Sequence, residues 1–263
     1  MLALIDADIV AYRCAAVTKE EHESVALIQV EEMIKRILET TKADSYISYI
    51  TGPNNFRYKV NPEYKANRKD VEKPPHLQAC KDFIVKHWNG FVTDGYEADD
   101  GMGMAQTKET VICSIDKDML MIPGLHFNFV GKKDPSGVYV PFFTEIDQLE
   151  GIKQLYRQMI IGDPTDNIFG VKGIGKVGAA KEIDHLETEQ EMIETVALLY
   201  GLDLERFIMN ADCLWIWRNM NEKYSDRKDV PWLEMMLQET KLKVKSPVKN
   251  IVGASTAYSE KLK

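Results

Sequence analysis

Short apolar runs that alternate with helical stretches constrain the fold of this chain more than any other feature. The first half contains four such runs: Leu2 to Ile5, Ser45 to Ile50, Phe91 to Thr93 and Thr110 to Ile115. Between them, Val25 to Leu38 and His76 to Trp88 carry apolar residues at helical spacing. Strands that alternate with helices favour a parallel sheet covered by helices. We therefore predict an α/β fold, with a mostly parallel sheet flanked by helices, over residues 1–145.

The pattern changes after a final pair of strand-like runs. Leu125 to Val130 and Val138 to Phe143 flank a polar loop and predict a hairpin at the edge of the sheet. Only helical stretches follow: Gln148 to Ile160, Lys176 to Ile183, Thr188 to Leu199, Leu204 to Trp217 and Pro231 to Glu239. We predict a helical subdomain over residues 146–240 and a flexible basic tail over residues 241–263, which lack helical periodicity.

Acidic residues stand at the ends of several apolar runs. Asp6 ends the first run, where ligands of open α/β sheets bind, although Asp6 and Asp8 would also suit the N-terminus of a helix. Glu97, Asp99 and Asp100 crowd into four residues, which is more than helix capping requires. On a helix Glu97 and Asp100 share one face and Asp99 points elsewhere.

Two further acidic pairs have spacings that converge their side chains. Asp116 and Asp118 lie two residues apart, and extended backbone would place both on one face. Asp163 and Asp166 lie three apart and converge if the chain turns helically after Pro164. Like charges on one face are unfavourable unless a cation lies between them. An acidic set without His or Cys suits Mg²⁺, which prefers oxygen ligands.

The net charge of −8 is compatible with a polyanionic partner. The candidate metal ligands account for the whole excess, because the other 33 acidic residues match the 33 Lys and Arg in number. Four well-separated cysteines without a CxxC pair argue against a zinc ribbon or disulfide framework. A cytoplasmic location is expected, or the host cytoplasm for a viral protein. No segment is apolar over a length that predicts a signal peptide or membrane contact.

A basic and aromatic stretch follows the second strand-like run. Residues 57 to 73 carry six Lys or Arg against three acidic residues, with Tyr58 and Tyr64 between them. Cations contact phosphates and aromatic rings stack on unpaired bases, so the stretch suits single-stranded nucleic acid. A solvated charged loop, with Tyr64 packed on the core, is the alternative interpretation.

Glycines precede the second helix of the C-terminal half. Gly173 and Gly175 stand just before the stretch that begins at Lys176, where bare N–H groups and the helix dipole attract phosphate. Residues 173 to 178 also match GxGxxG, the dinucleotide fingerprint. That match is weak, because Pro, Asp, Asn and Gly precede it in place of a strand and no return strand follows.

Five motifs in order give the chain a wider resemblance: Leu4-Ile5-Asp6, residues 62 to 68, Glu97-Ala98-Asp99-Asp100, residues 114 to 118 and residues 162 to 175. With these motifs it resembles the 5′ nuclease superfamily, which includes bacteriophage 5′–3′ exonucleases, flap endonucleases and the N-terminal domains of bacterial DNA polymerase I. The resemblance covers about residues 1 to 240. It implies a PIN-like nuclease core with a gateway or arch segment at about residues 54–75. A helix-three-turn-helix motif is implied at about residues 160–183.

The resemblance also implies a role for each candidate residue. The first metal cluster would be formed by Asp6, Glu97, Asp99 and Asp116, the second by Asp118, Asp163 and Asp166, with Asp100 as a further carboxylate of the site. Lys65 and Arg68 would contact the scissile phosphate. DNA contacts are expected from Arg57, Lys59, Tyr64, Lys69, Gly173, Gly175 and Lys176. Many relatives have an aspartate just after the second strand; here Thr51-Gly52-Pro53-Asn54-Asn55 lacks one, and Asn54 or Asn55 would hold a metal-bound water there.

The expected activity is 5′–3′ exonuclease or flap endonuclease cleavage of DNA in replication or repair. It would use two Mg²⁺ ions, with Mn²⁺ as a substitute, and a K⁺ ion at the helix-three-turn-helix turn as in some relatives. Expected partners are DNA with a free 5′ end or 5′ flap and a replication polymerase or single-strand-binding protein. A catalytically impaired DNA-binding protein of the same fold and a PIN-type ribonuclease are the alternatives.

Overall fold

A six-stranded sheet in the order β3-β2-β1-β4-β5-β6 organises the N-terminal half of this computed structural model, which describes residues 1–230. The strands are β1 (Leu2–Asp6), β2 (Ser45–Ile50), β3 (Gly90–Val92), β4 (Thr110–Cys113), β5 (Gly124–Lys133) and β6 (Tyr139–Ile146). The first five are parallel to their neighbours, and β6 pairs antiparallel with β5. The predicted α/β fold, including the edge hairpin, is confirmed.

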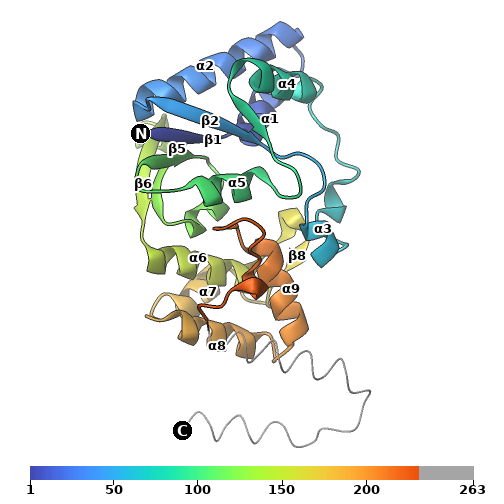
Figure 1. Cartoon of the computed structure of the whole chain (residues 1–263), viewed down its shortest axis with the longest axis vertical. Coiled ribbons are helices and arrows are strands. Elements are labelled where there is room, and N and C mark those ends of the chain that lie inside the picture. The colour runs from blue at the N-terminus through green and yellow to red at the C-terminus, as the bar shows by residue number, and fades with distance from the viewer. Residues whose placement is uncertain (231–263) are drawn as a thin grey trace, which may run out of the picture. The chain divides into compact units, whose positions relative to one another are not determined.

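Helices cover both faces of this sheet. They are α1 (Ala7–Val17), α2 (Glu23–Thr41), α4 (Leu77–His87) and α5 (Ala98–Ala105). Figure 1 shows α2 and α4 on one side of β1 and β2, and α5 on the other. The core between α1, α2, α4 and the sheet includes Ala3 and Ile5 of β1. Because side chains alternate along a strand, Asp6 at the end of β1 points to the opposite face, toward α5.

Two glycines allow α5 to pack closely on both of its sides. A Cβ on Gly101 would lie 2.7 Å from the Tyr49 ring of β2, and one on Gly103 would lie 2.6 Å from the carbonyl oxygen of Trp217. Neither neighbour leaves room for a side chain. The close approach fixes the first turn of α5, which carries three acidic residues, against the end of the parallel strands.

The C-terminal half is helical, as predicted. Its helices are α6 (Gln148–Ile161), α7 (Lys176–Ile183), α8 (Glu189–Leu199) and α9 (Leu204–Leu214), which Figure 1 shows gathered in one group. Two short strands, β7 (Gly162–Asp163) and β8 (Ile168–Phe169), follow α6. Trp215 and Trp217 are buried, in agreement with a packing role. The predicted helix Pro231 to Glu239, with Trp232, and the predicted tail 241–263 lie outside the described residues.

The basic and aromatic stretch forms short turns of helix. It contains α3 (Arg57–Val60) and a 3-10 turn at Ala66–Arg68. Residues Met1–Asp226 form one compact unit, and Arg227–Val230 belong to a second. The division at residue 145 stays a prediction. Within residues 1–230, no helix combines the length and apolarity that a membrane span needs.

Candidate metal and nucleic-acid site

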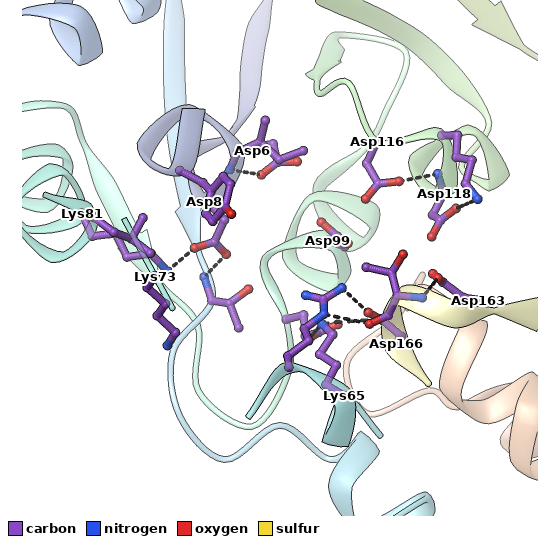
Figure 2. A pocket seen from close by; sticks show the side chains of 18 of the residues that line it. Asp6, Asp8, Lys65, Lys73, Lys81, Asp99, Asp116, Asp118, Asp163 and Asp166 are labelled. Carbon is purple, nitrogen blue, oxygen red and sulfur yellow. Dashed lines mark hydrogen bonds and ion pairs between the residues drawn. The ribbon is translucent and has the colours of Figure 1, made fainter. Parts of the chain in front are cut away.

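One pocket of about 630 Å³ brings together most of the candidate residues from distant parts of the sequence. Its carboxylates are Asp6, Asp8, Glu97, Asp99, Asp116, Asp118, Asp163 and Asp166. Its cationic residues are Lys65, Arg68, Lys69, Lys73, Lys81 and Lys117. Figure 2 shows Asp99 between two groups, one with Asp8 and Lys81, the other with Lys65 and Asp166, and Asp116 beside Asp118. The pocket therefore joins opposite charges from both halves of the chain.

The carboxyl ends of two parallel strands supply the floor of the pocket. Asp6 ends β1, accepts a hydrogen bond from the Ile9 N–H at 3.1 Å, and thereby caps α1. Ser114, directly after β4, donates its hydroxyl to the other Asp6 oxygen at 2.7 Å. Asp6 is 2% exposed. Metal-ligand and capping interpretations are compatible here, because the capping carboxylate also faces the pocket.

The segment after β4 corrects one premise about the backbone. Asp116 and Asp118 do not lie in extended chain, because a 3-10 helix runs from Lys117 to Met121 with Asp116 as its N-cap. The Asp118 N–H donates to the Asp116 Oδ1 at 2.9 Å. Both side chains still line the pocket, since the turn brings them to the same side.

The expected turn after Pro164 is present. Residues Pro164–Asp166 form a 3-10 turn, and Asp163 caps it by accepting the Thr165 N–H at 2.9 Å. Asp163 and Asp166 both line the pocket. The backbone N–H of Lys65 donates to the Asp166 carbonyl at 2.9 Å, which fixes this turn to the basic stretch.

Three carboxylates in the pocket are poorly compensated. Burial, together with the charges of Asp8 and Asp116, raises the pKa of Asp6 to about 7 against the opposing hydrogen bonds from Ser114 and Ile9. Burial also raises the pKa of Asp118 to about 7, with Asp116 adding to the effect. The pKa of Asp99 rises well above its usual value because of burial and then the charges of Asp6 and Asp116. The protein itself does not neutralise this cluster.

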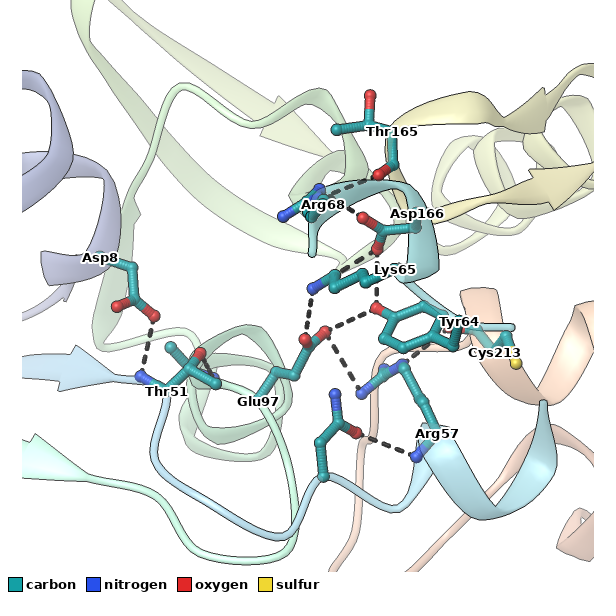
Figure 3. Close-up of polar contacts among 12 residues, drawn as sticks. Asp8, Thr51, Arg57, Tyr64, Lys65, Arg68, Glu97, Thr165, Asp166 and Cys213 are labelled. Atoms are coloured by element: carbon teal, nitrogen blue, oxygen red, sulfur yellow. Dashed lines mark hydrogen bonds and ion pairs between the residues drawn. The ribbon is translucent and has the colours of Figure 1, made fainter. Parts of the chain in front are cut away.

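Two cations of the basic stretch pair with the other carboxylates (Figure 3). Lys65 forms an ion pair with Glu97 and lies 3.6 Å from Asp166, which also pairs with Arg68. Burial alone would raise the pKa of Glu97, but Lys65 and Arg57 hold it below its usual value. The predicted phosphate contacts Lys65 and Arg68 therefore stand directly beside predicted metal ligands.

The structure corrects the predictions for Arg57 and Asp100. The guanidinium of Arg57 donates two hydrogen bonds to Asp100, at 2.6 and 2.9 Å, and two more to the carbonyls of Cys213 and Trp215. Arg57 is 2% exposed and Asp100 is fully buried. Neither lines the pocket, so DNA contact by Arg57 and metal binding by Asp100 are not supported. The assignment of α5 faces was also wrong, because Asp99 lies in the pocket and Asp100 points inward.

Tyr64 also differs from the prediction of a DNA contact. Its side chain is buried, and its hydroxyl lies 2.7 Å from Asp166 and 3.0 Å from Glu97, so its single proton is shared between these two carboxylates. A ring in this position has no free face for a base. The packed alternative for Tyr64 is the one that the structure supports.

A carboxylate from another element, α1, stands beside the segment that follows β2. Asn54 donates to Asp94 at 2.9 Å and Asn55 accepts the Arg57 N–H at 3.0 Å, so neither lines the pocket. The expectation that they hold a metal-bound water is not supported. Instead Asp8 of α1 accepts the Thr51 N–H at 2.8 Å and places its carboxylate at this strand end.

The remaining predicted DNA contacts lie on the surface. Lys59 and Lys69 are exposed, and Lys69 lines the pocket. Gly173 has φ +84° and Gly175 precedes α7 as its N-cap, both with open space where a side chain would stand. Lys176 is the exposed first residue of α7. The turn leaves backbone N–H groups accessible, as phosphate binding requires.

The donor set fits hard divalent cations in its chemistry. Eight carboxylates supply oxygen ligands, and the buried Oδ1 of Asp118 accepts no hydrogen bond, with Lys117 3.7 Å away. Within residues 1–230, however, no three acidic, His or Cys side chains already converge on one metal position. Ion pairs with Lys65, Arg68 and Lys81 hold Glu97, Asp166 and Asp8. Ion binding would require these pairs to rearrange.

Sequence reasoning did not include several pocket residues. Lys73, Lys81 and Lys117, and the aromatic residues Tyr12 and Tyr58, line the pocket without having been assigned to it. Asp8 was interpreted as a helix start. The Asp6-Ala7-Asp8 spacing was an available signal for Asp8, but Lys81 had none, since a lysine on an amphipathic helix is usual.

Comparison with known proteins places this geometry in a family. The model of the 5′-3′ exonuclease N-terminal resolvase-like domain matches residues 1–135. The chain belongs to this family. DNA polymerase I of Caldicellulosiruptor bescii is 25% identical over 95% of this chain and 33% of its own length. The 5′-3′ exonuclease of Mycoplasmopsis pulmonis is 23% identical over 73% of this chain and 69% of its own length. The chain thus spans about a third of that polymerase.

Solved structures show the same fold. A structure of T5 5′-exonuclease with bound zinc ions matches with a TM-score of 0.57 and 16% identity, over 90% of this chain and 98% of that one. A bacteriophage T5 flap endonuclease in a pseudo-enzyme-product complex with DNA and metal ions matches with a TM-score of 0.53 and 18% identity, over 90% and 98%. The 5′ nuclease resemblance found in the sequence is confirmed at the level of family and fold.

Proposed function

We propose that this chain is a metal-dependent 5′ nuclease that hydrolyses DNA phosphodiesters as a 5′–3′ exonuclease, a flap endonuclease or both. The observation that carries this proposal is the pocket, where carboxylates from distant parts of the chain lie beside the cations Lys65 and Arg68. Burial and then neighbouring carboxylates raise the pKa of Asp6, Asp99 and Asp118 there. Membership of the 5′-3′ exonuclease family supports it.

The proposed metal ligands form two sets. A first ion would be held by Asp6, Glu97, Asp99 and Asp116, and a second by Asp118, Asp163 and Asp166. Two Mg²⁺ ions, or Mn²⁺, would supply an activated water and stabilise the leaving oxygen in a two-metal hydrolysis. The deprotonated carboxylates would hold these ions in position. The products would be a 5′-phosphate and a 3′-hydroxyl.

Lys65 and Arg68 are the proposed contacts to the scissile phosphate. Both side chains face the pocket from the basic stretch, and both are charged at neutral pH. They would stabilise the negative charge that develops on the phosphate during cleavage. The turn at Gly173 and Gly175 would bind the duplex backbone, with a K⁺ ion in that turn as a further proposal. A polymerase or single-strand-binding partner also stays a prediction.

The test compares DNA structures side by side. End-labelled 5′-flap, nicked, blunt and single-stranded DNA are incubated with the protein in Mg²⁺ and in EDTA, and the first cut is mapped. We expect cleavage in Mg²⁺ alone, nearest the junction or 5′ end. DNA binding without cleavage in Mg²⁺ or Mn²⁺ would favour a non-catalytic DNA-binding protein. Faster cleavage of the matching RNA substrates would favour a ribonuclease.

A further inference from the structure

Two further cations of the pocket, Lys73 and Lys81, stand on the side away from Lys65 and Arg68 (Figure 2). Lys81 projects from α4 and forms an ion pair with Asp8, the carboxylate beside the segment that follows β2. Both side chains are about three-quarters buried, at 24% and 26% exposure, and both line the pocket. Figure 2 shows Lys81 and Asp8 on one side of Asp99, with Lys65 and Asp166 on the other.

Helix packing does not depend on this ion pair. Helices α1 and α4 already meet through an apolar core that contains Cys14, Cys80 and Ile84, all fully buried. A partly exposed ion pair adds little stability to such a contact. Joining the two helices therefore does not explain why Lys81 lies in the pocket.

The local hydrogen bonds aim the ammonium group into the pocket. One Asp8 oxygen is held by the Thr51 N–H at 2.8 Å, and the other pairs with Lys81. Among residues 1–230, Asp8 is the hydrogen-bond partner recorded for the Lys81 ammonium. An ammonium group has three donors, so two stay available for a ligand.

The ligand that fits these donors is a phosphate. The proposed function places one phosphate at Lys65 and Arg68, and the strand must then pass the acidic floor of the pocket. Phosphates near Asp6 and Asp8 meet like charges, and a cation on that side offsets the repulsion. Lys81 lies at the place where this cation is needed.

We propose that Lys81 binds a phosphate of the DNA strand next to the one at Lys65 and Arg68, and that Asp8 positions it. This inference rests on the proposed function, and it adds the contact that fixes the strand on the second side of the cut. Lys81 is a binding residue in this arrangement. Asp8 acts through Lys81 and Thr51 and is a positioning residue.

The first test measures binding of 5′-flap DNA by fluorescence anisotropy in EDTA, across a salt series. Lys81→Met should weaken binding about fivefold at about 0.1 M salt and reduce the slope of log affinity against log salt by about one. Lys81→Arg should restore both quantities. Lys86→Met is the matched control, because Lys86 is exposed on the same helix and does not line the pocket.

A second test locates the phosphate. A single neutral methylphosphonate is moved along the strand through the positions that flank the cut. At the contacted position, Lys81→Met should weaken binding no further, because the charge that it contacts is already absent. If the loss caused by Lys81→Met is the same at every position, direct phosphate contact is ruled out.

The role of Asp8 is tested by combining variants. If Asp8 positions Lys81, Asp8→Asn should weaken binding of flap DNA in EDTA, and it should lose that effect in the Lys81→Met background. The same loss of affinity with and without Lys81 would overturn the positioning role of Asp8.

The failure of this inference can be told from the failure of the proposed function. If the wild type cuts DNA but Lys81→Met and Lys86→Met change DNA affinity equally, the inference is overturned. If the wild type neither binds nor cuts DNA, the proposed function is overturned.

Discussion

The pocket and the buried layer behind it use the same residue types in opposite ways. In the buried layer, which we call the buried junction, Arg57 neutralises Asp100 through two hydrogen bonds and donates to two backbone carbonyls. In the pocket, burial and the charges of Asp6 and Asp116 raise the pKa of Asp99, the neighbour of Asp100, more than Lys65 lowers it. One aspartate is fully satisfied by the protein and the other is left with unbalanced charge.

This difference distinguishes charged groups that stabilise the fold from charged groups whose repulsion a ligand would relieve. A buried ion pair with every donor satisfied holds segments together and has nothing left to bind. A buried cluster of like charges is maintained against its own repulsion, and such clusters mark functional sites. The four predictions below test the contrast, in order of decreasing expected effect.

The largest expected effect concerns the pocket. Asp116→Ala should reduce single-turnover cleavage in Mg²⁺ by about 10⁴-fold, because it removes a ligand that no neighbour replaces. Binding of flap DNA in EDTA should remain largely intact. Asp82→Ala, on the exposed side of α4, is the control and should cut at the wild-type rate. Undiminished turnover of Asp116→Ala would contradict its proposed role.

The second effect concerns the buried junction. Arg57→Met should lower the free energy of unfolding by about 3–5 kcal/mol, because Asp100 would be left buried without its partner. Urea denaturation measures the change, and Asp100→Asn should destabilise the protein in the same way. Lys69→Met is the control, as an exposed cation of the same segment. A stable Arg57→Met protein with a smaller salt dependence of DNA binding would reinstate Arg57 as a DNA contact.

The third effect is a pH dependence of stability in the metal-free protein. Asp6 and Asp118 have pKa values of about 7 when folded, against a usual value of 3.8. The folded state therefore binds more protons than the unfolded state, and the free energy of unfolding should fall as pH rises from about 5 to 7.5, by ~2 kcal/mol.

Urea denaturation in EDTA across that range measures this decline. Saturating Mg²⁺ should reduce it, because the ion binds the deprotonated carboxylates of the folded state. Asp6→Asn and Asp118→Asn should each flatten the pH profile. Stability that stays constant or rises between these pH values would show that the protein compensates the pocket as it does the buried junction.

The smallest effect separates catalysis from binding at Lys65. Lys65→Met should slow single-turnover cleavage about tenfold, since it removes the positive charge proposed to stabilise the negative charge that develops on the phosphate. It should change the free energy of unfolding by less than about 1 kcal/mol, because Glu97 keeps Arg57 at 3.6 Å and the Tyr64 hydroxyl. DNA affinity should fall less than the rate does. Equal losses of affinity and rate would assign Lys65 to binding alone.

Periodicity predicted most of the fold. The parallel strands, the edge hairpin and helices α6 to α9 follow apolar patterns that depend on local geometry, which is why their approximate bounds could be read from the sequence. The turn after Pro164 was predictable for the same reason. Asp116 and Asp118 show the limit, because the predicted extended chain is a 3-10 turn capped by Asp116, although both side chains still line the pocket.

The sequence by itself determined that carboxylates stand at the ends of parallel strands and that a basic segment and a glycine turn accompany them. Only the tertiary structure decided which of these charges line the pocket and which are paired in the interior. Asp99 and Asp100 differ by one position and by about 100° around a helix, and the close packing of α5 through Gly101 and Gly103 sends one to the pocket and the other to Arg57. The burial and ion pairing of a side chain depend on neighbours that are distant in the chain, such as Lys81 for Asp8. The local sequence pattern does not identify these neighbours.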